Sequence, residues 1–490
     1  MTTSTSQTTP TTAFVDIFIL TFNAGKEQID PPVFASHLRD AFARNGTDLP
    51  ELVVVCLQEL APLAKCFIGS YMINPYFQSY VTAVNLAASN HVARSRQAQD
   101  EHQGAAGNRY AGHDADQDVH QHDEEPRDPP YTLVVSRNVG LTGIMLFALD
   151  PDSLQALKST EVGFGAGDTA NKGAVGLRMF FSKEDAEGRK RETELTFVGT
   201  HLSAHEWNLE KRNKNWESIV SALLFEDPKK LRGSKSANPT PHTSGSGDET
   251  DNLLPHDPNE KALHDITIYK PGSHLFVAGD LNYRISKTPP SDKSDFPNLD
   301  PKSPNYFKRF LTLDQLTSEK AAGRTLHGLR ESTILFPPTY KLVVGEKAAR
   351  WEWALNRWPG WCDRILYLDI PPWASRSATA TEIKMDTLAY DALPPVRTSD
   401  HRAVFLRLRV PVLEPSLLAP SDEVRASDSK DPRIKLPYPV DFESWDHRLR
   451  VKKWEWVMGW CLLVSQSKQG IAIFVTLFLV GLGTVWLRSR

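Results

Sequence analysis

Residues suited to acid–base and phosphate chemistry follow a short apolar run at Leu275–Ala278 of this 490-residue chain. The run is too short for a helix and is preceded by a Pro-Gly pair, so it predicts a buried strand. Such a strand carries Asp280, Asn282 and Arg284 to the edge of a sheet. There Asp280 can take a proton from water, Asn282 can hold that water or a phosphate oxygen, and Arg284 can pair with an anion. A polar turn that only ends a strand uses the same residue types, so this stretch alone leaves both interpretations open.

Polar side chains of matching chemistry also follow other predicted strands. Each one alone fits a turn, a helix cap or a structural hydrogen bond. Together they supply hard oxygen ligands for Mg²⁺, a base, imidazoles for phosphate oxygens and cations for further phosphates. The sequence therefore predicts one site built from these strand ends: Asn23, Gln58-Glu59, Asn171-Lys172, His201 with His205, Asp280-Asn282, Asp363-Arg364 and Asp400-His401, with Lys341 as a further cation.

Apolar runs predict the strands that position these residues. They cover residues 14–22, 52–57, 131–136, 143–148, 175–181, 195–199, 275–278, 365–368 and 404–410. Helical patterns lie around residues 32–44 and 206–224. Many strands, mostly joined by hairpins and interspersed with helices, indicate a layered α/β sheet protein. The glycine-rich stretch 163–167 lacks a strand–helix context, so neither a Rossmann fold nor a P-loop is indicated.

Composition narrows the class of protein. A formal charge of −4 and an isoelectric point of about 6.4 argue against a general nucleic-acid binder, which usually shows a strongly basic surface. Four cysteines without paired metal spacing fit a reducing compartment, and Cys56 is expected to be a buried thiol. Residues 1–12 form a Thr/Ser-rich polar tail without the apolar core of a secretory signal, and we expect them to be disordered.

Two insertions interrupt the pattern, at about residues 89–130 and 233–260. The first is rich in Gln, Asp and His, and a His-rich tract can bind metal. We expect both to be disordered, because neither composition can bury a core. Residues 13–412 are therefore expected to form the catalytic domain. After Val412 the chain becomes Pro- and Ser-rich, which indicates a boundary and a linker over 413–469.

The C-terminal stretch 470–487 contains no charged residue and is 18 residues long, close to the ~20 that cross a bilayer core. Trp486 and Arg488 stand where interfacial anchors would stand. The alternative is a buried core helix, which we disfavour because the run is apolar all round. Upstream, residues 448–456 combine basic and aromatic side chains. The apolar stretch 456–464 is too short to span, so an interfacial juxtamembrane segment is predicted before a transmembrane anchor.

Three motifs closely resemble the signature motifs of the inositol polyphosphate 5-phosphatases. They are FVAGDLNYR at 276–284, PGWCDRIL at 359–366 and SDHRAV at 399–404. Further motifs look like the family's remaining blocks in the family's order, at 21–23, 57–59, 171–175, 201–205, 212–213 and 336–341. The resemblance covers about residues 14–410 apart from the two insertions. The WCDRIL block discriminates, because the wider endonuclease/exonuclease/phosphatase superfamily shares only the Glu, Asp-x-Asn and Asp-His pieces.

The resemblance implies a deoxyribonuclease I-like fold, which is a four-layered α/β sandwich with two facing mixed sheets. It also implies Mg²⁺-dependent hydrolysis of the 5-phosphate of an inositol ring. Carried over residue by residue, Glu59 would hold Mg²⁺ with Asn23 and Asp400 close to it. Asp280 would activate the attacking water, and Asn282 would position it.

The same resemblance implies roles for the remaining site residues. His401 would contact the scissile phosphate, oriented by Asp363, and His201 would support the transition state from the opposite side. This division fits phosphoryl transfer, which needs an in-line water and charge neutralisation more than covalent help. The ring phosphates would be met by Asn171, Lys172, Tyr340, Lys341 and Arg364, the last three at the neighbouring 4-phosphate.

The chain departs from the family's usual pattern at two positions without chemistry, Gly360 and Ala403, where the family usually has Ala and Pro. The loop between Lys341 and Trp361 has its own sequence beside the phosphate-binding motifs. Substrate preference, among phosphoinositides such as phosphatidylinositol 4,5-bisphosphate and soluble inositol polyphosphates, is therefore left open.

The leading hypothesis is a monomeric phosphoinositide 5-phosphatase anchored to a membrane, with no nucleic-acid partner. A C-terminal anchor keeps the active site close to a lipid head group, and the basic cluster Arg448–Lys453 adds attraction to anionic lipid. A single-pass topology with a cytosolic catalytic domain is expected, in the endoplasmic reticulum first and the mitochondrial outer membrane second. Two alternatives are a neutral sphingomyelinase-like phosphodiesterase or nuclease on the same fold, and a non-catalytic membrane adaptor.

Overall fold

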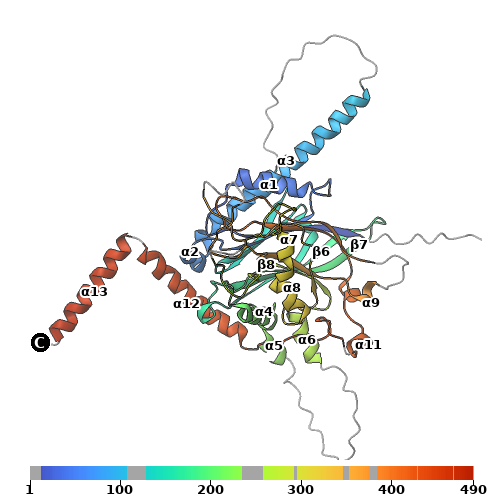
Figure 1. Cartoon of the computed structure of the whole chain (residues 1–490). Coiled ribbons are helices and arrows are strands. Elements are labelled where there is room, and N and C mark those ends of the chain that lie inside the picture. Colours follow the sequence, from blue (N-terminus) through green and yellow to red (C-terminus); the bar gives the residue numbers. More distant parts are fainter. Residues whose placement is uncertain are drawn as a thin grey trace, which may run out of the picture.

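Two facing six-stranded mixed sheets form the centre of the protein (Figure 1). The structure is a computed structural model that describes residues 13–107, 128–233, 258–291, 295–345, 352–375, 383–427, 429–466 and 468–488. The first sheet has the order β11 (Asp386–Ala392), β12 (Val404–Pro411), β1 (Phe14–Asn23), β2 (Leu52–Gln58), β4 (Thr142–Ala148), β3 (Thr132–Val139). The second has the order β5 (Leu154–Gly163), β6 (Gly173–Glu184), β7 (Lys190–His201), β8 (Ser273–Asp280), β10 (Asp363–Leu368), β9 (Leu329–Arg330).

Helices cover the outer faces of both sheets, which makes the four layers. Helices α1 (Pro31–Phe42) and α3 (Asn74–Gly107) pack on the first sheet, and α4 (Leu209–Ala222) and α8 (Gln315–Ala321) pack on the second. The other helices are α2 (Leu63–Ile68), α5 (Pro228–Gly233), α6 (Pro258–Ile266), α7 (Phe307–Phe310), α9 (Pro372–Ser375), α10 (Pro415–Leu418), α11 (Asp422–Arg425), α12 (Ser444–Ser465) and α13 (Lys468–Arg488). The predicted α/β sandwich is confirmed.

Alternation along each strand decides which side chains meet between the sheets. In β8, Phe276 and Ala278 face the core between the sheets, whereas Leu275 and Val277 face the helices. Because strand side chains alternate with period two, Asp280 continues the inner face. The strand is buried along its whole length, and its central run Leu275–Ala278 is apolar, as the sequence indicated.

Strand pairing gathers the polar strand ends at one edge of the sandwich. Strands β1 and β2 run parallel and place Asn23 opposite Gln58, and β7 and β8 run parallel and place His201 opposite Asp280. Strand β10 is antiparallel to β8 and begins with Asp363 opposite Asp280. The predicted convergence of these ends is thus a consequence of the sheet topology.

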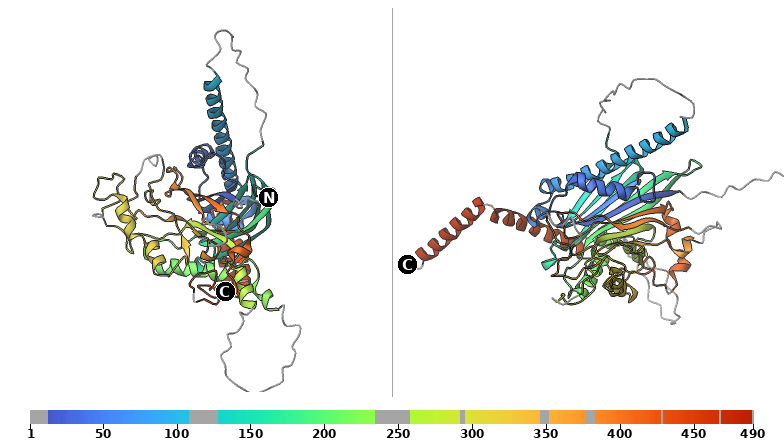
Figure 2. Two further views of the ribbon diagram at one scale, coloured as in Figure 1. Left: turned by 90° about the vertical axis from the view of Figure 1, so that its right-hand side faces the viewer. Right: turned by 45° about the horizontal axis from the view of Figure 1, so that its top comes forward.

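Several predicted boundaries differ from the structure. Strands β5, β9 and β11 were not predicted. Helix α3 continues to Gly107, so the predicted disordered insertion is helical over its first part, and α6 lies at the end of the second predicted insertion. Figure 2 shows the far end of α3 extending beyond the sheets. Tyr76, Tyr80 and Ala87 anchor its near end in the core, which explains why a helix forms there. Residues 1–12, 108–127 and 234–257, where disorder was predicted, lie outside the described residues.

The predicted linker after Val412 packs against the catalytic domain in several places. Leu418, Arg433 and Glu455 are buried, and α12 contacts α2. Gly459 of α12 permits this packing, since a Cβ there would lie 3.0 Å from side-chain atoms of Phe67 and Ile68.

The apolar C-terminal stretch forms helix α13, which lies away from the sheets in Figure 1. Within the described part of the chain, no helix combines the length and apolar character that crossing a membrane requires. The side chains of residues 471, 473–475, 477, 478 and 487 lie outside the described residues. The predicted helix is therefore present, and the predicted transmembrane anchor over 470–487 is not confirmed.

The fold predicts an acid-sensitive stability that depends on His274 of β8. Burial lowers the pKa of His274 from 6.5 to about 3. The native state therefore holds this imidazole neutral, while the unfolded chain takes up a proton near pH 6.5. His274 should cost the protein up to about 1.4 kcal/mol of unfolding free energy per unit as the pH falls from about 6.5 towards 3. Chemical denaturation of wild type and His274→Leu across this range should show a flatter dependence in the variant. Equal slopes would contradict the assignment.

Candidate active site

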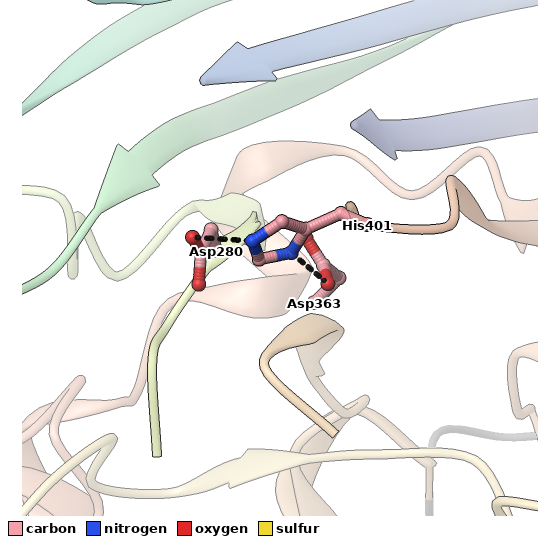
Figure 3. A group of neighbouring side chains, drawn as sticks. All are labelled: Asp280, Asp363 and His401. Atoms are coloured by element: carbon pink, nitrogen blue, oxygen red, sulfur yellow. Dashed lines mark hydrogen bonds and ion pairs between the residues drawn. The ribbon is translucent and has the colours of Figure 1, made fainter. Parts of the chain in front are cut away.

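The imidazole of His401 lies between two buried carboxylates, as Figure 3 shows. Its Nδ1 donates to Asp363 Oδ2 at 2.8 Å, and its Nε2 lies 3.8 Å from Asp280 Oδ2. Thr339 Oγ1 also donates to Asp363 Oδ2, at 2.7 Å, and fixes that carboxylate. Burial alone would lower the pKa of His401, but Asp363 and Asp280 outweigh it and raise the pKa to about 9. His401 is therefore an oriented cation at neutral pH.

Asp280 is the meeting point of donors from both sheets. Its Oδ2 lies 3.0 Å from Asn23 Nδ2 and 3.2 Å from His201 Nε2, and its Oδ1 accepts the Asn282 amide at 3.1 Å. Burial alone would raise its pKa, but the charge of His401 and the hydrogen bond from His201 hold the pKa well below the usual range. Asp280 therefore stays ionised in this site.

Glu59 follows β2 in a left-handed backbone conformation, with φ of 46°. Burial would raise its pKa, yet the nearby His201, Lys172 and Lys26 lower it. Lys26 Nζ pairs with Glu59 Oε2 at 3.0 Å. Glu59 is thus an ionised carboxylate at the same edge as Asn23.

The oxygen-rich donor set fits a hard divalent cation such as Mg²⁺. Ser399 Oγ donates to the Asn23 backbone carbonyl at 2.5 Å, which brings Asp400 to the edge that carries Glu59. Asn23 Oδ1 already accepts the Gly25 amide at 3.1 Å, so one lone pair of that oxygen is engaged. Asn171 Oδ1 is buried and has no hydrogen-bond partner among the described residues. Glu59, Asn23 and Asp400 are therefore the residues that would hold the ion.

A second group of potential metal-binding residues in the described chain consists of Asp280, Asp363 and His401, whose nearest atoms lie within 4.8 Å of one another. We disfavour it as the ion site. His401 Nδ1 and Asp363 Oδ2 are joined by a hydrogen bond, and Asp280 Oδ2 accepts from Asn23 and lies 3.2 Å from His201 Nε2, so these atoms are already engaged with one another and with their neighbours.

Lys172 and His201 form the other wall of the site. Lys172 Nζ contacts the His201 ring, at 3.3 Å from Nδ1 and closer to Nε2. Burial lowers the pKa of Lys172 to about 8, against the opposing pull of Asp280 and Glu59. Burial and the Lys172 charge also lower the pKa of His201. The neutral imidazole of His201 and the cationic amine of Lys172 can therefore both face the same phosphate oxygen.

Tyr340 and Lys341 lie beside the His401 wall. The Tyr340 ring is centred 4.5 Å from the His401 ring, and Lys341 Nζ is 3.5 Å from Asp400 Oδ2. The structure therefore places Lys341 next to Asp400, a predicted metal ligand. In that position the Lys341 amine can meet a phosphate oxygen.

Arg364 is the one predicted substrate ligand that the structure places elsewhere. Its guanidinium pairs with Asp314 at 3.0 Å and Glu331 at 2.6 Å, and its side chain is 1% exposed. In β10 the inner face is formed by Asp363, Ile365 and Tyr367, so Arg364 points to the helix-covered side. These two ion pairs occupy the guanidinium, so the contact of Arg364 with a ring phosphate stays a prediction that this arrangement does not favour.

Arg284, which the sequence indicated could pair with an anion, was not included in the predicted set of site residues, yet it lies within the site. It is 2% exposed, its Nε donates to the Asn282 carbonyl at 3.1 Å, and its guanidinium lies 4.3 Å from the Tyr340 ring centre. Nη1 has no hydrogen-bond partner among the described residues. Its place in the Asp-Leu-Asn-Tyr-Arg run was the available signal. Thr339 and Lys26 were also missed.

The profile of the endonuclease/exonuclease/phosphatase family 2 matches residues 20–407, more than half of the chain. The chain belongs to this family. A type I inositol polyphosphate 5-phosphatase 13 of Arabidopsis thaliana is 29% identical over 49% of this chain and 20% of its own length. A polyphosphatidylinositol phosphatase of Saccharomyces cerevisiae is 27% identical over 55% of this chain and 19% of its own length. The match thus spans about a fifth of the length of each of these two relatives.

Among solved structures, the inositol polyphosphate 5-phosphatase domain of SPSynaptojanin, in complex with inositol (1,4)-bisphosphate and calcium ion, has a TM-score of 0.51. It is 19% identical, and the match covers 89% of this chain and 91% of that domain. This likeness supports the two-sheet fold.

The two assignments for Arg364 and Lys341 can be separated by substitution. Arg364→Met should leave two buried carboxylates unpaired and destabilise the fold by roughly 3–5 kcal/mol, with KM unchanged below the melting transition. Lys341→Met, whose side chain is 27% exposed, should raise KM and leave the melting temperature nearly unchanged. Denaturation and phosphate-release kinetics measure both. A raised KM without destabilisation in Arg364→Met would restore its predicted role.

Proposed function

We propose that this protein is a Mg²⁺-dependent phosphatase that removes the 5-phosphate from the inositol ring of phosphoinositides such as phosphatidylinositol 4,5-bisphosphate. The relatives' names, the order of motifs and the site geometry support it. The single observation that carries it is the cationic His401 held by Asp363 opposite Asp280, because this places a fixed positive charge and a fixed carboxylate in one buried site.

The chemistry follows from the positions of these groups. His401 would donate from Nε2 to an oxygen of the scissile phosphate, and Lys172 with His201 would meet that phosphate from the other wall. Asp280 would orient the attacking water, and Asn282 would hold it. The bound Mg²⁺ would supply further neutralisation of phosphate charge. Fixed charges of this kind act where negative charge develops, which is the main requirement of phosphoryl transfer.

Asn282 is held for this role by its surroundings. It takes a left-handed conformation, with φ of 57°, its Nδ2 donates to the Leu202 carbonyl at 3.1 Å, and Arg284 donates to its Oδ1. Arg284 therefore fixes the position of Asn282.

The substrate is proposed to lie in a membrane surface, with soluble inositol polyphosphates as further substrates. Exposed Leu449, Trp454 and Trp456 of α12 stand beside the exposed Lys452, a combination that suits an interface of anionic lipid. Exposed apolar side chains of α13, Leu479, Val480 and Leu482 among them, would extend this contact. We propose a monomer with its catalytic domain on the cytosolic side of a membrane. The endoplasmic reticulum is the first choice for that membrane, and the mitochondrial outer membrane is the second.

The catalytic assignment predicts that Asp280→Ala abolishes phosphate release. The substrates are vesicles containing phosphatidylinositol 4,5-bisphosphate and soluble inositol 1,4,5-trisphosphate, each in Mg²⁺, with sphingomyelin as the control for a phosphodiesterase. Wild type should release phosphate from the first two, and chelation of Mg²⁺ should stop it. The variant should lose on the order of 10³-fold or more in kcat. Turnover of sphingomyelin, or retained turnover in Asp280→Ala, would contradict the proposal.

Membrane residence is tested separately by location in cells. A fluorescent fusion of the full chain should mark the endoplasmic reticulum, and removal of residues 468–490 should weaken that pattern because the exposed apolar face of α13 is lost. A diffuse signal from both forms would contradict membrane residence. A mitochondrial pattern would select the second membrane.

A further inference from the structure

Helix α12 contacts the loop that carries Asn171 and Lys172, although α12 lies beyond the residues matched by the family profile. One face of α12 is buried, and Glu455 on that face is 3% exposed while its neighbours Trp454 and Trp456 are more than half exposed. A buried carboxylate requires partners that satisfy its oxygens. Those partners show what the helix does.

Glu455 joins the active-site loop to α12. Its Oε1 accepts the backbone N–H of Ala170 at 2.6 Å. Arg448 lies 7 residues earlier on α12 and donates to both carboxylate oxygens of Glu455, at 2.9 and 2.7 Å. Its Nε also donates to Glu161 of β5 at 3.1 Å. A bidentate guanidinium fixes the direction of a carboxylate as well as its charge. The Glu455 oxygen is therefore aimed at Ala170.

The Ala170 peptide is held on its other side by the core of the site. Its carbonyl accepts the Leu141 amide at 3.1 Å, and the Leu141 carbonyl accepts the Leu60 amide at 3.1 Å. Leu60 directly follows the metal-ligand candidate Glu59. Gly140 allows this close approach, because a Cβ there would lie 1.9 Å from the Ala170 carbonyl oxygen. The hydrogen bond from Ala170 to the Glu455 carboxylate and two backbone hydrogen bonds thus link α12, through Ala170 and Leu141, to the residue after Glu59.

The same peptide sets the position of the substrate-facing residues. Ala170 is followed by Asn171, whose Oδ1 is buried without a partner among the described residues, and by Lys172, whose Nζ contacts His201. The loop has little freedom elsewhere, since a Cβ on Gly165 would lie 1.6 Å from Asn171 Oδ1. A shift of Ala170 would therefore move both walls of the site.

We propose that Glu455 is a positioning residue for catalysis, which holds Ala170 so that Lys172 on one side and Glu59 on the other keep their alignment. Helix α12 then supports the active site and is more than a connection to the membrane. This inference rests on the proposed function for its kinetic test. Its structural basis, the hydrogen bond from Ala170 to Glu455, is tested by hydrogen exchange, which does not depend on enzyme activity.

The test uses three variants of the full chain. Glu455→Ala removes the acceptor and leaves the Ala170 N–H buried without a partner. Glu455→Gln keeps an oxygen acceptor of the same reach but removes the charge that pairs with Arg448. Asp446→Asn is the matched control, since Asp446 lies on the same helix, pairs with Lys229 at 2.8 Å and is half exposed, away from the loop.

The kinetic readout is phosphate release from soluble inositol 1,4,5-trisphosphate in Mg²⁺, so that membrane contact plays no part. Glu455→Ala should lower kcat/KM about tenfold, the size expected for an orphaned buried donor. Glu455→Gln should stay within about threefold of wild type, and Asp446→Asn should equal wild type. The rescue by Gln separates positioning from ion-pair stability, because both substitutions break the pair with Arg448.

The structural readout is hydrogen exchange of peptides that cover residues 163–172 and 140–142. Glu455→Ala should speed exchange in both, and neither other variant should. If wild type releases no phosphate, the proposed function fails, and the exchange pattern alone supports or overturns the grip on Ala170. Equal losses of activity in Glu455→Ala and Glu455→Gln, or wild-type exchange and kinetics in Glu455→Ala, would overturn the inference.

Discussion

The structure depends on a buried, ionised carboxylate at the place where the two sheets meet. Asp280 is 1% exposed and accepts from Asn23 of the first sheet and from His201 of the second. A buried charge is tolerated only when it is paired and hydrogen-bonded, so this carboxylate requires both sheets to end in donors at the same edge. The requirement links the fold to the site, because strand order and register deliver those donors.

Charge balance at this edge explains the protonation states. His401 is raised in pKa by two carboxylates, whereas His201 is lowered by burial and by Lys172, so two imidazoles in one site differ in charge. That difference permits a cationic donor on one wall and a neutral ring on the other. Lys172, with a pKa of about 8, is the group closest to titrating in the working range. Arg448 and Glu455 extend the same principle to the C-terminal helix, where a buried pair orients the loop that carries Lys172.

The sequence allowed the fold class and most of the site to be predicted because the signal was local. Strands such as β8 contain apolar runs followed by polar residues suited to catalysis. The alternation of side chains along these strands places Asp280 and Asp363 inward. The same alternation indicates that Arg364, which follows the inward Asp363, points outward. Its role was assigned from the motif and not from the alternation.

Other features could not be predicted because they depend on distant contacts. Strand β5 has a mostly exposed, polar sequence and forms through its pairing with β6. The carboxylate of Glu455 is distant from Ala170 by 285 positions, and nothing near Glu455 in the sequence indicates burial. Helix α3 beyond residue 89 has a composition shared by helices and disordered segments. The helical character of 470–487 was predictable from its apolar run.

If the edge around Asp280 hydrolyses one defined phosphate ester, the products identify that ester. They can be followed by ³¹P NMR as the full chain acts on inositol 1,4,5-trisphosphate in Mg²⁺. We expect loss of the 5-phosphate resonance in step with the appearance of inorganic phosphate, with the 1- and 4-phosphates retained. Release of the 1- or 4-phosphate, or no release under conditions where the chain is folded, would contradict it.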